Sequence, residues 1–309
     1  MPEFSIVIPT YNREREVVRA IESCLLQEGA DFEVIVVDDA STDRSCANSA
    51  KIRDSRLKLL RHSVNRGSNA ARNTGVRSAA GQWFVILDSD DELAPGALAT
   101  MKAAAAATGN EVQRIAFMYR RDDGRVTPSP ALREELIDYP GYVRWLEGRQ
   151  YYDFMSCTRT TTFKDVSFPE GRWSDQALYN LDFAKRYVTL FREEIVAVVH
   201  TDADNRLSYL RRSRKHSRAT AARLGRELDE LLQRHGDAMR SFAPHTFQMF
   251  RRMRASYHFL EGRRVDGVKE MVGCLRATPL LAEAWLLLIV GTLGGGAFAT
   301  VRSWRSPAA

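Results

Sequence analysis

The 309-residue sequence has few cysteines and no glycine-rich nucleotide loop, and each shortage excludes a class of protein. No G-x-G-x-x-G follows the first apolar run and no G-x-x-x-x-G-K-[ST] occurs, which disfavours a dinucleotide-binding fold and a P-loop. The four cysteines form no C-x-x-C pair and are widely spaced: Cys24, Cys46, Cys157 and Cys274. This spacing in a long chain indicates reduced thiols rather than a disulfide framework or a zinc motif.

Long hydrophobic runs are also scarce, which excludes a polytopic membrane protein. Residues 279–301 alone approach the length of a membrane span, with Glu283 as their one charge, and their glycines weaken a continuous helix. This segment could span a membrane, lie on it or pack against the protein. The N-terminus lacks a charged segment followed by an apolar one, so we expect no signal peptide.

Charge is unevenly distributed along the chain. Residues 205–276 carry 17 Lys and Arg against 7 Asp and Glu, whereas residues 1–204 are net negative. The basic region lacks a nucleic-acid motif with interleaved aromatic residues, so we expect no nucleic-acid partner. Because the apolar segment follows it, an anionic membrane surface is the more attractive partner.

Short apolar runs alternate with helical patterns over the first 120 residues, which predicts an α/β fold with a mostly parallel sheet flanked by helices. Strands are expected at Phe4–Pro9, Glu33–Asp38, Leu57–Arg61, Trp83–Leu87 and Val112–Tyr119. Helices are expected at Glu14–Gln27, Asp43–Ala50, Ser68–Ala80 and Pro95–Ala107.

The remaining chain predicts a second half and a helical region. A helix over Tyr139–Glu147, a helix over Ser174–Lys185 and a strand over Val188–Val199 are expected, followed by two or three Arg-rich amphipathic helices. We therefore predict an α/β domain over residues 1–208, with two halves that meet near residue 120, and a basic helical region over 209–309 that includes the apolar C-terminal segment.

Polar clusters directly follow three of the apolar strands, where the carboxyl edge of a parallel sheet binds ligands. One cluster, Asp88-Ser89-Asp90-Asp91-Glu92, places four acids in five positions, and a divalent cation such as Mg²⁺ or Mn²⁺ would relieve their repulsion. A solvated acidic turn is the alternative for this run. In the other two clusters, Asp38-Asp39 could accept a hydrogen bond from a base such as uracil, and Tyr11 could stack on it.

Four motifs in this order resemble the family-two inverting glycosyltransferases of the GT-A fold. They are Pro9-Thr10-Tyr11-Asn12-Arg13, Val36-Val37-Asp38-Asp39-Ala40-Ser41-Thr42-Asp43, Asn65-Arg66-Gly67 through Ala71-Arg72-Asn73-Thr74-Gly75, and Leu87-Asp88-Ser89-Asp90-Asp91-Glu92. The resemblance covers about residues 4–100 and continues more loosely to about residue 208. It implies that residues 1–208 form a catalytic domain, with a nucleotide-sugar half over about residues 1–120 and an acceptor half over about residues 121–208. It implies a nucleotide-diphospho-sugar donor.

The resemblance also implies roles for individual residues. The donor would contact Pro9, Thr10, Tyr11, Asn12, Arg13, Asp38, Asp39, Arg72, Asp88 and Ser89. Asp88 and Asp90 would hold the metal, although Asp91 could take the place of Asp90. His200 would be a third ligand. The alternative for His200 is a surface residue, as is more common for a single His after a strand.

The family's general base corresponds to Asp175, although Ser174 replaces the glutamate that usually precedes it. Inverting transfer is one in-line displacement, and a positioned carboxylate that takes the acceptor's proton contributes about 10²–10⁴-fold. Asp175 could instead only cap the helix that follows it.

The sequence thus predicts a metal-dependent inverting glycosyltransferase that uses a nucleotide-diphospho-sugar, with a UDP-sugar favoured. Its acceptor would be a glycan or lipid-linked molecule in cell-surface polysaccharide synthesis, at the inner face of the cell membrane. A nucleotidyltransferase and a non-catalytic nucleotide-sugar or glycan-binding module of the same fold are the alternatives.

Overall fold

A computed structural model describes residues 1–128, 131–147, 153–170, 176–201, 218–277, 279–280 and 282–293. The chain divides into two compact units: residues 1–142 with 149–203, and residues 143–148 with 204–309. The boundary expected at residue 208 falls outside the described residues.

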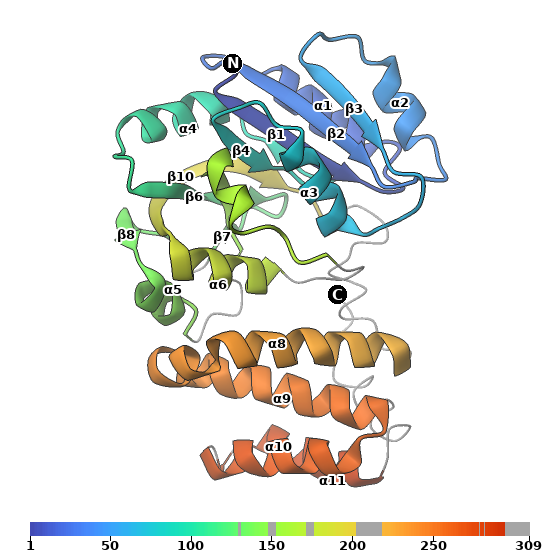
Figure 1. The fold of residues 1–309 in the computed structure, drawn as a ribbon, viewed down its shortest axis with the longest axis vertical. Coiled ribbons are helices and arrows are strands. Elements are labelled where there is room, and N and C mark those ends of the chain that lie inside the picture. Colours follow the sequence, from blue (N-terminus) through green and yellow to red (C-terminus); the bar gives the residue numbers. More distant parts are fainter. Residues whose placement is uncertain are drawn as a thin grey trace. The chain divides into compact units, whose positions relative to one another are not determined.

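The first unit is built on one mixed sheet with strand order β3-β2-β1-β4-β9-β6-β10-β5 (Figure 1). Its main strands are β1 (Phe4–Thr10), β2 (Phe32–Asp38), β3 (Leu57–Arg61), β4 (Trp83–Ile86), β6 (Val112–Arg121), β9 (Met155–Arg159) and β10 (Val188–Val199). The short strands β5 (Glu92–Leu93) and β8 (Glu135–Ile137) pair with β10, and β7 (Val126–Thr127) pairs with β6.

Strands β1 to β4 are parallel, as expected, so their carboxyl ends share one edge. The helices of this unit are α1 (Glu16–Leu25), α2 (Ser45–Lys51), α3 (Ser68–Arg77), α4 (Ala97–Ala106) and α6 (Gln176–Arg186), with α5 (Tyr139–Trp145) at the division between units and the 3-10 helix η1 (Thr160–Lys164). The expected strands and helices are confirmed, with ends that differ by a few residues. The observed α/β architecture is therefore the predicted one.

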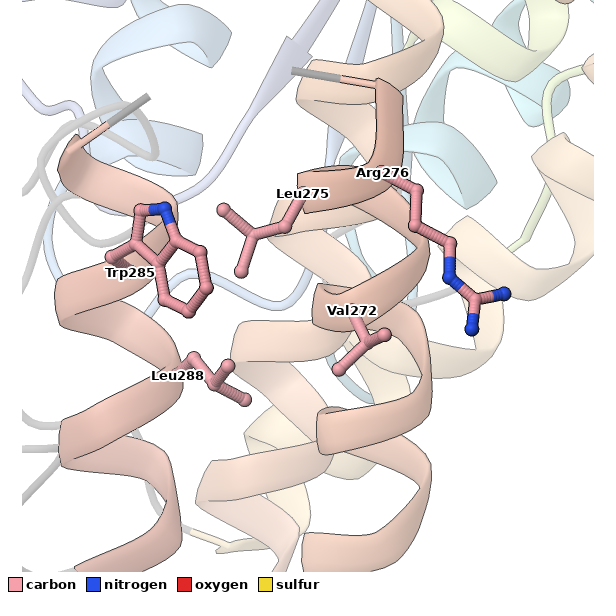
Figure 2. Close-up of a pocket in the computed structure, with 5 residues that line it drawn as sticks. All are labelled: Val272, Leu275, Arg276, Trp285 and Leu288. Carbon is pink, nitrogen blue, oxygen red and sulfur yellow. The ribbon is translucent and has the colours of Figure 1, made fainter. Parts of the chain in front are cut away.

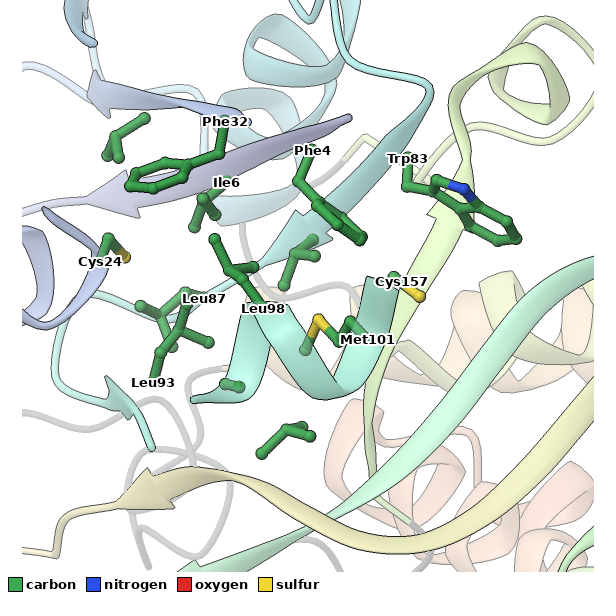
Figure 3. Packing of buried hydrophobic residues seen from close by; sticks show 14 of the residues in the cluster. Phe4, Ile6, Cys24, Phe32, Trp83, Leu87, Leu93, Leu98, Met101 and Cys157 are labelled. Carbon is green, nitrogen blue, oxygen red and sulfur yellow. The ribbon is translucent and has the colours of Figure 1, made fainter. Parts of the chain in front are cut away.

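Both faces of the sheet are buried, which explains why the strands are apolar throughout rather than alternating. On one face, Ile6 and Ile8 of β1 pack against Cys24 of α1 and Met101 of α4 (Figure 3). On the other face, Val7 packs with Ala71 and Val76 of α3 and with Phe168, Tyr179 and Phe183. The core thus holds the carboxyl edge of β1, β2 and β4 between two helical layers.

Gly75 sets how closely α3 approaches the sheet. A Cβ at this position would lie 2.2 Å from Cγ1 of Val7, closer than van der Waals contact allows. Helix α3 begins after Gly67, whose φ of +92° is readily adopted only by glycine. Glycines at these two positions therefore place α3 directly against β1.

The second unit is helical, with α8 (Arg218–Phe242), α9 (Pro244–Glu261), α10 (Arg264–Ala277) and α11 (Ala282–Leu293). Helix α9 begins at Pro244 and ends at Gly262, which has φ of +84°. Phe259 of α9, Met271 and Leu275 of α10, and Ala284 and Val290 of α11 form its apolar core. No helix in the described part of the chain has both the length and the apolarity to cross a membrane.

Candidate functional site

The carboxyl edge of the sheet brings the three polar clusters of the sequence together. Strand β1 pairs with β2 on one side and with β4 on the other. Thr10, the last residue of β1, is in register with Asp38, the last residue of β2, and Asp88 follows β4 two residues after its end. The expectation that these clusters lie along one sheet edge is confirmed.

Asp38 is fully buried at this edge and is only partly satisfied by its own chain. Its Oδ2 lies 3.1 Å from Nε of Arg61 and accepts a hydrogen bond from the Ser41 amide at 3.3 Å. Its Oδ1 and the Oγ1 of buried Thr10 have no hydrogen-bond partner among the described residues. Buried polar atoms of this kind are costly unless a ligand or water meets them.

Asp39 organises the loop that leads into α3. Its Oδ1 accepts hydrogen bonds from the Arg66 amide at 2.9 Å, and it lies 2.7 Å from Nδ1 of His62. Its Oδ2 accepts from the Gly67 amide at 2.7 Å. Both oxygens are thus engaged by loop 62–67, and the expected contact of Asp39 with the nucleotide stays a prediction.

The residues after β1 form a turn against the loop after β2. Asn12 has a left-handed φ of +52°, and its Oδ1 accepts from the Thr42 amide at 2.9 Å. The Arg13 amide donates to Oγ of Ser45 at 2.7 Å. Tyr11 is 42% exposed, and Pro9 lies inside β1. The Tyr11 ring is therefore accessible to a ligand at the edge.

Arg72 connects α3 with the acidic loop after β4. One of its terminal nitrogens donates to Oδ1 of Asp88 at 2.7 Å, and the other donates to Oδ1 of Asn69 at 2.7 Å. The Arg72 side chain is 5% exposed, whereas that of Asp88 is 46% exposed. Within the described residues, Nε of Arg72 has no hydrogen-bond partner. A nearly buried cation therefore meets an accessible carboxylate at the predicted donor site.

The rest of the acidic run is held by side chains on both sides. Arg19 of α1 donates to the Asp90 carbonyl at 2.7 Å and lies 3.4 Å from Oε1 of Glu92. The His200 amide donates to Oδ1 of Asp91 at 3.1 Å, and Nε2 of His200 lies 2.6 Å from Oε1 of Glu92. Ser89 is buried within this loop. The structure thus places His200 against Glu92.

The expected set of three metal ligands is not assembled in the structure. Over the described part of the chain, no group of three or more His, Cys, Asp and Glu side chains is placed to hold a metal ion. The carboxylate oxygens of Asp88 and Asp90 still suit Mg²⁺ or Mn²⁺. These ions are commonly held by one or two protein carboxylates and complete their coordination with water and substrate phosphate. Asp88 and Asp90 remain predicted ligands, whereas the contact of His200 with Glu92 does not support its role as a third.

The predicted base, Asp175, and Ser174 lie outside the described residues, but the segment that leads to them is firmly held by α3. Asn73 donates to the Phe168 carbonyl at 2.8 Å and accepts from the Phe168 amide at 3.0 Å. Asn69 donates to the Pro169 carbonyl at 2.9 Å. Two asparagines one helical turn apart therefore clamp the backbone of residues 168–169.

Glu170 completes this clamp. It accepts a hydrogen bond from Asn73 at 3.2 Å and pairs with Arg66 at 3.1 Å and Arg77 at 3.5 Å. The hydrogen bond from Asn73, followed by the charges of the two arginines, lowers the pKa of the Glu170 carboxyl below its ordinary value. This ionised carboxylate thus fixes the segment to both ends of α3.

Sequence reasoning assigned no role to Asn69, Asn73, His62 or Glu170. A signal was present, because two asparagines at positions i and i+4 share one face of a helix. A buried face with amide side chains must find polar partners. The identity of those partners, about a hundred residues further along the chain, required the structure.

Strand order, the parallel arrangement of β1 to β4 and the acidic loop after β4 define the GT-A fold of nucleotide-diphospho-sugar transferases. Among solved structures, the chain is similar to Staphylococcus aureus TarS 1-349 in complex with UDP-GlcNAc. The TM-score is 0.61 at 20% sequence identity, with 97% of this chain and 90% of that chain covered. At this identity the similarity concerns the fold.

The chain belongs to glycosyl transferase family 2, whose sequence profile matches residues 5–166. It is 44% identical over 112 residues to the succinoglycan biosynthesis protein ExoO of Rhizobium meliloti, covering 36% of this chain and 32% of that protein. It is 38% identical over 104 residues to the GalNAc(5)-diNAcBac-PP-undecaprenol beta-1,3-glucosyltransferase of Campylobacter jejuni, covering 33% and 34%. It is also 40% identical over 87 residues to the Escherichia coli UDP-Glc:alpha-D-GlcNAc-diphosphoundecaprenol beta-1,3-glucosyltransferase WfgD. That match covers 28% of this chain and 34% of WfgD. The matched region spans about a third of the length of each of these curated relatives.

Proposed function

We propose that this protein is an inverting glycosyltransferase that moves a sugar from a nucleotide-diphospho-sugar, with UDP as the favoured nucleotide, to a hydroxyl of a glycan or lipid-linked acceptor. Membership of glycosyl transferase family 2 supports the reaction class. The names of two relatives specify diphosphoundecaprenol-linked acceptors, and one of these also specifies a UDP-sugar. The ExoO name supports a role in cell-surface polysaccharide synthesis.

The observation that carries the proposal is a set of buried polar atoms without partners at the carboxyl edge. Among the described residues these include Oγ1 of Thr10, Oδ1 of Asp38 and Nε of Arg72. Thr10 on β1 supplies a hydroxyl, Asp38 on β2 supplies an oxygen that accepts hydrogen bonds, and Arg72 on α3 supplies a positive charge. A base with an imide N–H, a ribose and a diphosphate would satisfy such a set.

The donor would be held by residues with distinct tasks. The free oxygen of Asp38 would accept from the base, and the accessible Tyr11 ring would stack on it. The Arg72 guanidinium, already next to Asp88, would face the diphosphate and balance its negative charge. Asn12 and Arg13 would keep the turn around the base in place through their contacts with the loop after β2.

Asp88 and Asp90 would hold Mn²⁺ or Mg²⁺. When bound, the cation neutralises the charge that develops on the departing diphosphate. The hydrogen bond from Arg72 balances the charge of Asp88 from the side of α3. Arg19 and His200 position the loop by holding the Asp90 carbonyl, Glu92 and the Asp91 carboxylate.

Asp175 would take the proton from the acceptor hydroxyl as that oxygen attacks the anomeric carbon. A base must lie within hydrogen-bond reach of the acceptor, so the segment that carries it must be fixed. Asn69, Asn73 and Glu170 fix residues 168–170, which lie five to seven positions before Asp175 in the sequence. This gives α3 a double task, since it also carries Arg72.

The test is a transfer assay with labelled UDP-sugars and undecaprenyl-diphosphate-linked sugar acceptors. We expect UDP release with glycosylated lipid, and Asp175→Asn should lower turnover about 10²-fold or more while UDP binding is unchanged. Asp237→Asn is a matched control, because it makes the same change at a side chain that is 97% exposed. It should leave turnover unchanged.

The alternatives predict different products. A nucleotidyltransferase would release pyrophosphate in place of UDP, which would contradict sugar transfer. A binding module of the same fold would bind UDP-sugar but release no UDP with any acceptor. An Asp175→Asn variant with normal turnover would remove Asp175 from the mechanism.

We also propose that the enzyme works at the cytoplasmic face of the cell membrane. All four cysteines are free, and three of them are buried, which suits a reducing compartment. A lipid-linked acceptor would require contact with the membrane surface. Fractionation of cells that express the full chain should recover it on the inner membrane and release it with high salt. Recovery only outside the cytoplasmic compartment would contradict this location.

A further inference from the structure

Helix α11 exposes an apolar face in the second unit. Trp285, Ile289 and Leu293 recur every four residues and are 49%, 57% and 70% exposed. Leu280, shortly before the helix, is 97% exposed. The outward face of a helix in contact with water is normally polar. An apolar stripe at helical spacing therefore marks an interaction surface.

A groove between α10 and α11 lies beside this surface. Figure 2 shows Leu275 and Val272 of α10 and Trp285 and Leu288 of α11 directed into the groove between the two helices, which they line together with Arg276. The Arg276 guanidinium extends away from the groove, at its border. The groove is thus apolar inside and cationic at its rim.

Two basic side chains of α10 are not paired with its acids. Lys269 and Arg276 are exposed, and within the described residues neither forms an ion pair with a carboxylate. The acids of α10 are engaged elsewhere, since Asp266 pairs with Arg263 at 2.9 Å and Glu270 pairs with Arg251 at 2.9 Å. Among the described residues, α10 thus presents two cations without ion-pair partners, and one of them, Arg276, lies at the groove that Trp285 also lines.

We propose that this face of α10 and α11 binds the surface of an anionic phospholipid bilayer. Apolar side chains would enter the boundary between headgroups and acyl chains, while Lys269 and Arg276 reach the lipid phosphates. The Trp285 indole N–H donates to the Pro279 carbonyl at 2.9 Å, so its ring could enter lipid without leaving a donor unsatisfied. Within the described residues α11 spans Ala282–Leu293, and this stretch is shorter than the about 20 residues that a membrane-spanning helix needs.

Two features favour a membrane over a second copy of the chain. A two-fold symmetric dimer through this face would bring Lys269 and Arg276 of both copies close to one another, which their like charge disfavours. The proposed lipid-linked acceptor also places the enzyme beside a bilayer. The second argument rests on the proposed function. The exposure of the apolar side chains of α11 and the positive charge on α10 do not depend on it.

The test is sedimentation of the full chain with vesicles of phosphatidylglycerol or of phosphatidylcholine at low and high salt. We expect binding to the anionic vesicles at low salt and loss of binding at high salt. Lys269→Gln with Arg276→Gln should weaken partitioning about thirty-fold, because each cation near an anionic surface contributes about five-fold. Ile289→Gln with Leu293→Gln should also weaken it, even at low salt.

Matched controls use equally exposed residues of the first unit. Lys51→Gln with Lys58→Gln removes the same charge, and Leu26→Gln, at a side chain that is 80% exposed, removes apolar surface. Both should bind vesicles normally. Calorimetry with UDP on each variant should be unchanged, which separates failure of this inference from failure of the proposed function.

Equal vesicle binding by the α10–α11 variants and the wild type would overturn the proposal. So would concentration-dependent dimerisation that the Ile289→Gln and Leu293→Gln pair abolishes, without any binding to anionic vesicles. Loss of binding confined to these variants would support it.

Discussion

The clamp formed by Asn73 makes the most specific prediction about how α3 serves the site. Asn73 is 1% exposed and makes three hydrogen bonds to residues 168 and 170. Asn73→Ala would leave the Phe168 amide and carbonyl without these partners beside a side chain that is 4% exposed. Each of these two buried groups left unsatisfied costs about 1–3 kcal/mol, so we expect a loss of about 2–6 kcal/mol of unfolding free energy.

Asn48→Ala is the matched control. Asn48 makes one side-chain hydrogen bond to a backbone carbonyl, that of Glu14, at 2.9 Å and lies on α2. Its removal should lower the free energy of unfolding by about 1 kcal/mol and leave turnover unchanged. Asn73→Ala should in addition lower turnover, because the segment before Asp175 loses its anchor.

Urea unfolding measures how far each variant lowers the free energy of unfolding relative to the wild type. Hydrogen exchange reports directly on the Phe168 amide. We expect this amide to exchange much faster in Asn73→Ala than in the wild type or in Asn48→Ala. If Asn73→Ala costs no more than Asn48→Ala and the Phe168 amide stays protected, the clamp is not what fixes this segment.

Three further predictions concern charge and thiol chemistry. The fold lowers the pKa of Glu170, so its stabilisation is present above the ordinary value of 4.5 and is lost as pH falls through the lower folded value. Glu170→Gln should therefore flatten the fall in stability below about pH 4.5, and an unchanged pH profile would contradict this. Burial raises the pKa of Cys24 to about 12 and also raises that of Cys157. A thiol reagent at about pH 8 should therefore modify the half-buried Cys46 before either of them, which mass spectrometry of the labelled peptides would show. Faster labelling of Cys24 or Cys157 would contradict their burial. Arg72→Met should weaken UDP binding in the presence of Mn²⁺ by about ten-fold or more, since a charge-assisted hydrogen bond contributes about 1.5–3 kcal/mol. If calorimetry shows that the affinity for UDP is unchanged, Arg72 is not part of the donor site.

The fold could be predicted from sequence because its strands are buried on both faces. Runs such as Ile6-Val7-Ile8 have no polar face, and the helices between them are clearly periodic, so few other arrangements are possible. The same logic placed Thr10, Asp38 and Asp88 at one edge, because the carboxyl ends of parallel strands must meet there. Local pattern thus sufficed for the sheet and the edge.

The partners of individual side chains could not be predicted in this way. The contact of His200 with Glu92, which follows from the pairing of β10 with β5, could not be read from the sequence, and the expected role of His200 as a third metal ligand stays a prediction. The role of Asn73 depends on contact with Phe168, which lies 95 residues away in sequence. Such contacts are set by tertiary packing, which neither spacing nor propensity encodes.

Calorimetry with UDP, GDP and TDP, each with and without Mn²⁺, tests the central claim most directly. We expect UDP to bind in the presence of Mn²⁺ and at least about ten-fold more weakly when the cation is chelated, with the cation dependence lost in Asp88→Asn with Asp90→Asn. UDP affinity that is the same with and without Mn²⁺, and the same in that double variant, would contradict a cation-dependent nucleotide site at the carboxyl edge of the sheet.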